Sequence, residues 1–468
     1  MVFTSHIFVY YFLPLLLLVY FNLPYRARNL FLTVISYLFY GWWNPSFMAL
    51  MFAATLVNFA AGHVIGMPRS TPRRRRVALI IAVAINLTLL GFFKYFMFFT
   101  NSLNMLLAMR GFELLPVLRV TLPIGISFYT FQALSYTVDV YRGAARPARS
   151  FVDFACFVAL FPQLIAGPII RYHTVAEQLV ERTHTASRFA SGVSLFIVGL
   201  AKKILLANVM GEVADAVFGA RQPVPADAWF GVLAYAFQIY FDFSAYSNMA
   251  IGLGRMIGFE FPRNFNAPYV AESITDFWRR WHVSLSTFLR DYLYIPLGGN
   301  RKGAARTYVN LATVMVFGGL WHGANWTFVA WGVIHGGLLI WERWMGKESI
   351  YRFLPRPARV AITFLLVLFT WVMFRSATLA DAGAFYAAML GLAHTGSTSV
   401  LLAGEIYSTQ YLLVMSVCTA LTIQPVQTFD WSQRSHGPLV AVGLILLFLV
   451  ALLVMSTQAF NPFLYFQF

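Results

Sequence analysis

Long apolar segments recur along the whole chain and constrain its fold more than any other feature. Of the 468 residues, 59% are hydrophobic and only 11% are charged, which is about half the charged fraction of a typical soluble chain. In a bilayer the backbone polar groups must be satisfied within the protein, so lipid-facing apolar segments form helices. The sequence therefore predicts an all-α, polytopic helical membrane protein.

The apolar segments also predict how the chain is organised. The candidate segments are residues 7–22, 29–42, 47–65, 77–99, 122–141, 151–170, 189–206, 229–257, 308–333, 360–374, 411–423 and 439–455. Several are shorter than the ~20 residues that cross a bilayer, as is typical of re-entrant pieces that are buried in protein. We expect about 11 to 13 membrane segments in a single integral domain, residues 1–468, with the catalytic region at about 240–340.

The basic residues indicate orientation rather than nucleic-acid binding. The formal net charge is +16, but the basic residues lie in short loops between apolar segments, where they set topology and contact anionic lipid headgroups. The cluster at residues 73–76 is the clearest case. Basic loops follow the first, third and fifth segments. Because basic loops are usually cytoplasmic, this pattern predicts an N-terminus outside the cytoplasm. The first segment lacks the marks of a cleaved signal peptide, so we expect it to be retained.

A histidine in an apolar run is the strongest chemical signal. His322 lies between the glycines at 318, 319 and 323, which allow another backbone or an acyl chain to approach closely. An ionisable group at membrane depth is costly and is usually functional. Imidazole is also the side chain best suited to move a proton near neutral pH. The alternative is a packing histidine that is bonded to a neighbouring carbonyl.

A second histidine, His282, lies in the stretch of residues 276–287, within a region from 242 to 325 where polar residues are concentrated in an otherwise apolar chain. If residues 276–291 form one helix, Trp278 stacks on His282, and Ser286 follows one turn later. That arrangement would place a histidine, a hydroxyl and an aromatic wall on one face. The alternative is an amphipathic interfacial helix, but such a helix has no need of a central histidine.

Side chains beside the two histidines are candidates to bind an acyl donor. Arg279 and Arg280 fit the phosphates of a donor such as coenzyme A, although Arg280 is also an i,i+4 partner of Asp276. Trp321 and Asn325 flank the other histidine, and together with Ser286 they complete the candidate donor contacts.

The two histidines together suggest acyl transfer. One imidazole would take the proton from an acceptor hydroxyl, while the other orients a group or stabilises the oxyanion. The G-x-S-x-G motif of a serine acyl-enzyme is absent, so direct transfer is the simpler hypothesis. His335 is a second-tier candidate. Cys156 and Cys418 lack metal-ligand spacing, so no metal site is expected.

These motifs resemble the membrane-bound O-acyltransferase (MBOAT) family, and within it the membrane subunits that O-acetylate bacterial alginate. The matching runs are residues 1–3, 40–43, 122–129, 161–168, 240–244, 277–286, 297–301, 319–323 and 462–468. The resemblance covers nearly the whole chain, and the order of these moderately specific runs makes it strong.

The resemblance implies a ring of helices around a funnel that narrows where the two histidines meet. It marks His322 as the family's essential histidine and His282 as the second histidine of the site. It also implies a multi-pass protein of the bacterial inner membrane that takes acetyl from a cytoplasmic donor, acetyl-CoA, with no bound cofactor. The expected partner is a periplasmic SGNH-hydrolase-like acetyltransferase, which works with other polysaccharide-biosynthesis proteins.

Other functions remain open from the sequence. Similar subunits act on cellulose or peptidoglycan, and a related branch transfers D-alanine to teichoic acid. A transporter or export component also contains intramembrane charge, but it predicts pseudo-repeated halves, which are not visible here. A structural scaffold for glycan export would leave the two histidines without a purpose.

Overall fold

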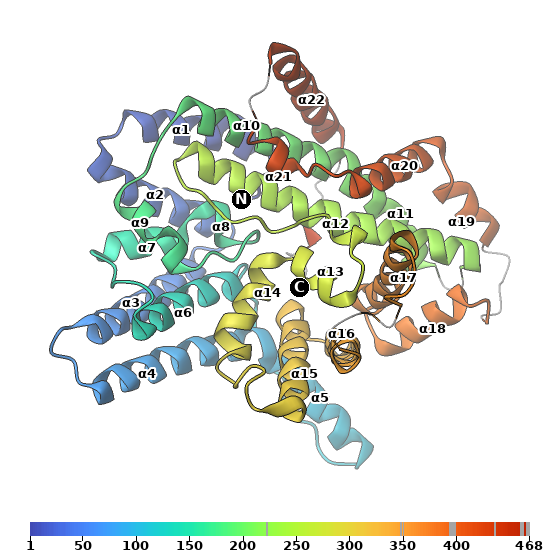
Figure 1. Cartoon of the computed structure of the whole chain (residues 1–468), viewed down its shortest axis with the longest axis horizontal. Coiled ribbons are helices and arrows are strands. Elements are labelled where there is room, and N and C mark those ends of the chain that lie inside the picture. Colours follow the sequence, from blue (N-terminus) through green and yellow to red (C-terminus); the bar gives the residue numbers. More distant parts are fainter. Residues whose placement is uncertain are drawn as a thin grey trace. The chain divides into compact units, whose positions relative to one another are not determined.

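The computed structural model describes residues 1–220, 223–346, 349, 351–392, 399–434, 437–458 and 463–464. Every regular element in these ranges is a helix (Figure 1), which confirms the all-α prediction. The chain divides into two compact units, Met1–Val193 with Ala250–Pro262, and Ser194–Met249 with Arg263–Phe468. The following description treats each unit by itself.

The first unit begins with apolar helices. It contains η1 (Ile7–Phe12), α1 (Leu13–Asn22), α2 (Tyr25–Gly41), α3 (Ser46–Gly66), α4 (Pro72–Leu90), η2 (Gly91–Tyr95), α5 (Phe96–Met109), α6 (Ile126–Arg142), α7 (Phe151–Ala159), α8 (Phe161–Leu164), α9 (Tyr172–Val180) and the first half of α10 (Ala186–Ala201). The predicted segment 151–170 is therefore two short helices, α7 and α8, rather than one span.

The second unit carries most of the polar motifs. It contains the end of α10, η3 (Lys202–Ala207), α11 (Asn208–Gly219), most of α12 (Pro225–Met256), η4 (Pro268–Val270), α13 (Ile274–Arg280), α14 (Val283–Leu289), η5 (Arg290–Tyr294), α15 (Gly303–His322), α16 (Trp326–Trp344), α17 (Arg356–Arg375), α18 (Leu379–Met389), α19 (Ser399–Ile406), α20 (Thr409–Ile423), α21 (Thr428–Trp431) and α22 (Pro438–Thr457).

Five helices among the described residues are long and apolar enough to cross a membrane. They are Ser46–Gly66, Pro72–Met109, Ala186–Gly219, Arg356–Arg375 and Pro438–Thr457, and Ile7–Asn22 and Thr409–Ile423 are shorter apolar helices. The chain is therefore a multi-pass membrane protein. The total of about 11 to 13 segments, which counts re-entrant pieces, stays a prediction.

Buried amides hold three helices of the first unit together. The side-chain amides of Asn58 on α3 and Asn86 on α4 donate to each other's oxygens at 3.2 and 3.1 Å. The Thr137 hydroxyl on α6 donates to the same Asn58 oxygen at 2.8 Å. Since lipid tails are as apolar as leucine, such interhelical hydrogen bonds favour helix association in a membrane.

The predicted segment 308–333 is two helices instead of one. It breaks after α15 because Gly323 is extended, with φ −163° and ψ 150°, and Asn325 caps α16 by accepting from the Thr327 N–H. Apolar composition alone does not mark a break of three residues. His322 consequently lies at the end of a helix, and not in the middle of one.

Glycines let α15 and α16 pack at backbone distance. A Cβ added to Gly319 would clash with the Phe328 carbonyl oxygen, and one added to Gly332 would clash with the Met315 carbonyl oxygen. The close approach that the glycines predicted is therefore made by a neighbouring helix at Gly319. This contact supports the turn that presents the candidate histidine.

A buried ion pair anchors the C-terminal tail in the second unit. Lys203 Nζ lies 2.6 Å from Asp242 Oδ1, and both side chains are at most 3% exposed. The second carboxylate oxygen of Asp242 accepts from the Leu464 N–H at 2.8 Å, while the Phe463 ring packs on Lys203 and Tyr246. The rest of the tail motif 462–468 lies outside the described residues.

We expect Lys203→Met to destabilise the protein by about 3–5 kcal/mol, because it leaves the Asp242 carboxylate buried without its cation. The double variant Lys203→Met/Asp242→Asn should recover much of that loss, since it removes both charges and keeps an acceptor for the Leu464 N–H. Thermal melting in detergent measures both effects, with the exposed Lys302→Met as control. A single variant that melts like wild type would contradict the prediction.

Candidate active site

His282 lies at a sharp break between α13 and α14. Its backbone is left-handed, with φ 44° and ψ 53°, a conformation that histidine tolerates better than most residues. At the break, Asn266 N–H donates to the Arg280 carbonyl, and Val283 N–H donates to the Asn264 carbonyl, both at 2.9 Å. The prediction of one helix over residues 276–291 is therefore wrong. A neighbouring chain segment satisfies the backbone groups that the break releases.

The Asn264 side chain sets the tautomer of His282. The Asn264 oxygen accepts from the Ser284 N–H at 3.3 Å and from the Ser284 hydroxyl at 2.8 Å, and its amide donates to Ser247. A backbone N–H is always a donor, so this atom is the oxygen. Two contacts compete for His282 Nδ1: the Asn264 oxygen at 3.2 Å, which requires Nδ1 to donate, and the Leu285 N–H at 3.4 Å, which requires Nδ1 to accept. Because the Asn264 contact is the shorter, we assign the proton to Nδ1.

Nε2 is consequently the basic atom of His282. The imidazole is fully buried, with the Phe243 ring 4.6 Å from it between centroids. His282 lies outside the five candidate spans, and burial lowers the pKa of its imidazole to about 3. Desolvation thus keeps the ring neutral near neutral pH, with a lone pair on Nε2.

Replacing Asn264 should impair this arrangement. Asn264→Leu keeps the shape of the side chain but removes the acceptor for the His282 Nδ1–H. We expect the rate of the hypothesised acyl transfer to fall about 10- to 100-fold, the loss seen when the hydrogen-bond partner that orients a metal-bound histidine is removed. Asn264→Asp retains an acceptor and should keep more activity than the leucine variant. The turnover rate at saturating donor measures both. Equal rates for the two variants would contradict an orienting role for Asn264.

The structure brings the two candidate histidines together. The ring centroids of His282 and His322 are 6.5 Å apart, and His322 is only 3% exposed. Trp321 lies beside both rings, at 5.6 and 4.9 Å. Trp331 and Phe374 pack on His322 at 5.3 and 5.1 Å. The result is a histidine pair within aromatic walls, a setting that excludes water and strengthens electrostatic interactions.

Trp278 packs on His335 instead of His282, which corrects the stacking expected from the sequence. The Trp278 indole donates to His335 Nδ1 at 3.2 Å, so Nε2 carries the proton and donates to the Thr370 hydroxyl at 3.1 Å. Both ring nitrogens of this fully buried histidine therefore have protein partners. His335 has the contacts of a packing residue and makes a matched control for the histidine pair.

The side chains predicted to bind the acyl donor differ in exposure and in their hydrogen bonds. Arg279 is exposed, whereas Arg280 is held by both oxygens of Asp276 at 2.9 Å, as i,i+4 spacing predicted. The Ser286 hydroxyl donates to a backbone carbonyl of the break at 3.4 Å. Asn325 caps α16 and also donates to a backbone carbonyl at 2.8 Å. A role of these side chains in donor binding stays a prediction.

Several site residues were not singled out by the sequence. Asn264 and Ser284 were visible only as members of polar runs, and Trp331 and Phe374 read as ordinary apolar positions. Lys203 carried a usable signal, because an ionisable residue within an apolar span is rare. No group of three or more His, Cys, Asp or Glu side chains within the described ranges is arranged to hold a metal.

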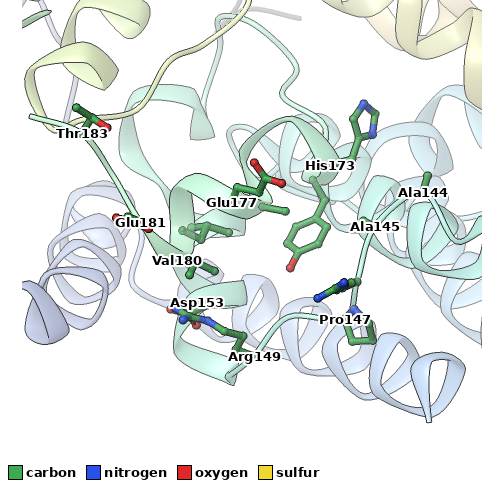
Figure 2. A pocket seen from close by; sticks show the side chains of 14 residues that line it. Ala144, Ala145, Pro147, Arg149, Asp153, His173, Glu177, Val180, Glu181 and Thr183 are labelled. Atoms are coloured by element: carbon green, nitrogen blue, oxygen red, sulfur yellow. Dashed lines mark ion pairs between the residues drawn. The ribbon is translucent and has the colours of Figure 1, made fainter. Parts of the chain in front are cut away.

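A separate cavity of about 890 Å³ lies within the first unit (Figure 2). Arg149 and Asp153 pair at 3.5 Å on its wall. His173, another wall residue, contacts the Asp139 carboxylate through Nδ1 at 2.7 Å. Its lining charges are mixed, with Arg146, Arg149, Asp153, Glu177 and Glu181. Since carboxylates oppose the arginines, the cavity is poorly suited to a polyphosphate.

Comparison with known proteins yields consistent matches. The family model for MBOAT, the membrane-bound O-acyltransferase family, matches residues 144–379. The chain is 43% identical to "Probable alginate O-acetylase AlgI" of Azotobacter vinelandii and 44% identical to the protein of the same name from Pseudomonas putida, over the full length of each pair. It is 36% identical to "Peptidoglycan O-acetyltransferase" of Helicobacter pylori, over 84% of this chain and 80% of that protein.

Proposed function

Because the chain belongs to the membrane-bound O-acyltransferase family, we propose that it supplies acetyl groups for O-acetylation of an exopolysaccharide, alginate. The chain is thus a membrane-bound acyltransferase. Support for alginate comes from the names of relatives that match over their full length. The observation that carries the chemistry is the buried histidine pair, with ring centroids 6.5 Å apart.

In this proposal the acetyl group moves directly from donor to acceptor. His322 takes the proton from an acceptor hydroxyl, and the hydroxyl oxygen attacks the acetyl carbonyl carbon of a thioester. The carbon–sulfur bond breaks, and the proton passes to the leaving thiolate. The lone pair on Nε2 of His282 accepts a hydrogen bond from the acceptor and so orients it beside His322. Asn264 holds the His282 ring in the tautomer that leaves this lone pair on Nε2.

The donor and the receiving partner complete the proposal. The donor is cytoplasmic acetyl-CoA, and the protein lies in the inner membrane with its N-terminus in the periplasm, as the basic loops indicate. A periplasmic SGNH-hydrolase-like acetyltransferase receives the acetyl group from this chain and transfers it to the polysaccharide hydroxyls. Exposed Arg279 is the best placed of the candidate arginines to meet donor phosphates, since Arg280 is bonded to Asp276.

The test uses purified chain in proteoliposomes with radiolabelled acetyl-CoA. We expect release of free coenzyme A together with label on the periplasmic partner or its glycan. Label on the partner or its glycan distinguishes acetyl transfer from thioester hydrolysis, and loss of that label in His322→Ala would link the transfer to the histidine. Flux of a substrate without any acyl donor would instead favour the transporter alternative.

Peptidoglycan O-acetylation is the second candidate, because of the similarity to the Helicobacter pylori protein. Supplying alginate or peptidoglycan with the partner protein separates the two. Label on the alginate alone supports the first proposal, whereas label on muropeptides alone would replace it.

A further inference from the structure

An apolar cavity in the second unit has a cation at one end. Its volume is about 640 Å³, and its walls come from α10 and η3, from α20, from the connection that contains α21, and from the first half of α22. Most lining side chains are aliphatic. Lys202, Gln424, Thr428 and Trp431 form the polar end. A concave, mainly apolar space with a few convergent polar groups is the usual form of a ligand site.

Lys202 is the informative residue of this cavity. It lies within the candidate span Ala186–Gly219, where an ammonium group is costly unless it has a counter-charge. Its Nζ donates to the Thr428 hydroxyl at 2.7 Å. In the described part of the chain no carboxylate lies within ion-pair distance of Lys202, in contrast to its neighbour Lys203. An anion at this position would supply the missing charge.

The position of the Lys202 ammonium in the chain indicates which kind of anion would bind there. Thr428 begins α21, in the polar connection between α20, which ends at Ile423, and α22, which begins at Pro438. The ends of two apolar helices mark the level of the headgroups. Lys202 begins within the span, but its side chain extends to this polar connection, so its ammonium group is within reach of a lipid phosphate. The remaining cavity runs along α22 toward Leu447, that is, toward the hydrocarbon.

We propose that this cavity binds an anionic glycerophospholipid from the surrounding membrane, with one acyl chain in the apolar part and the phosphate on Lys202. The site is distinct in residues and chemistry from the histidine pair, and it does not depend on which glycan is acetylated. Charge complementarity and the apolar walls together favour a lipid over a soluble anion.

Gly443 offers a steric test that leaves the charge intact. It lies on the cavity wall, and a Cβ there meets nothing within 4 Å, so Gly443→Phe should fill the cavity without distorting α22. Lys202→Met removes the ammonium and keeps a chain of similar length. Leu453→Phe, at a position on the same helix that is 68% exposed, is the matched control.

The experiment measures lipid retained by the purified full chain, using native mass spectrometry with added phosphatidylglycerol or phosphatidylcholine. Wild type and Leu453→Phe should retain phosphatidylglycerol preferentially. Lys202→Met should lose roughly tenfold in affinity for it, the scale of a lost charge-assisted hydrogen bond, and Gly443→Phe should lose both lipids. Unchanged binding in either variant, or equal retention of the two lipids by wild type, would overturn the proposal.

A second measurement does not depend on how the variants fold. Wild-type chain is labelled with phosphatidylglycerol that carries a photoactivatable group at the end of one acyl chain. Cross-links should map to the cavity walls, at residues 198–206, 417–431 and 440–447. Cross-links confined to other helices would show that the lipid binds elsewhere.

Discussion

The His322→Ala variant is expected to lose acetyl transfer by about 10²- to 10⁴-fold or more, the range for removal of a general base. The reason is the position of the imidazole, which is 3% exposed and lies 6.5 Å from the His282 ring between centroids. The rate of coenzyme A release with radiolabelled acetyl-CoA measures the effect. The loss should appear in kcat, because the residue acts in the transition state.

Controls separate lost chemistry from lost structure in this variant. Truncating a buried side chain leaves a cavity, so His322→Gln serves as a second variant that fills more of the space. His335→Gln is the matched control, because that histidine is also fully buried but bonds to Trp278 and Thr370. Normal acetylation by either His322 variant would contradict the assignment of His322 as the general base. In cells, export that persists while acetyl groups disappear would exclude a scaffold.

The second large effect is expected at His282, where the backbone conformation dictates the substitution. Alanine in the left-handed region costs about 1–2 kcal/mol, so His282→Ala mixes strain with loss of the imidazole. Asparagine tolerates this region and is a good N-cap. His282→Asn should therefore melt near wild type while transfer falls by about 10²- to 10⁴-fold.

Turnover and melting temperature are read on the same preparation of His282→Asn. A folded variant with a wild-type rate would show that the imidazole at 282 is not needed. A comparable loss in His282→Asn and Asn264→Leu would indicate that the tautomer, set by the 3.2 Å contact between the two side chains, is what the site requires.

Much of the helical architecture could be predicted from the sequence. The predicted segment 7–22 corresponds to η1 and α1, and the predicted segment 439–455 lies within α22, because a long apolar run has few alternatives in a bilayer. The breaks were harder to predict. Residues 308–333 read as one apolar segment, and the extended backbone at Gly323 interrupts it without any change in composition.

The candidate site was predictable in its residues but not in its geometry. His322 and His282 stand out because ionisable side chains are rare among apolar residues. The break at His282 depends on hydrogen bonds from the 264–266 segment, which is remote in sequence. A periodic pattern records the neighbours one helical turn away, so it placed Trp278 on His282 when its true partner is His335.

The sequence alone thus determined that this chain is a helical membrane protein with two histidines in a polar region, since both follow from residue chemistry and local order. Only the tertiary structure decided which nitrogen of His282 is basic and that Lys203 neutralises Asp242. It also left Lys202 facing an apolar cavity. These features depend on contacts between distant segments, which packing creates and local periodicity does not encode.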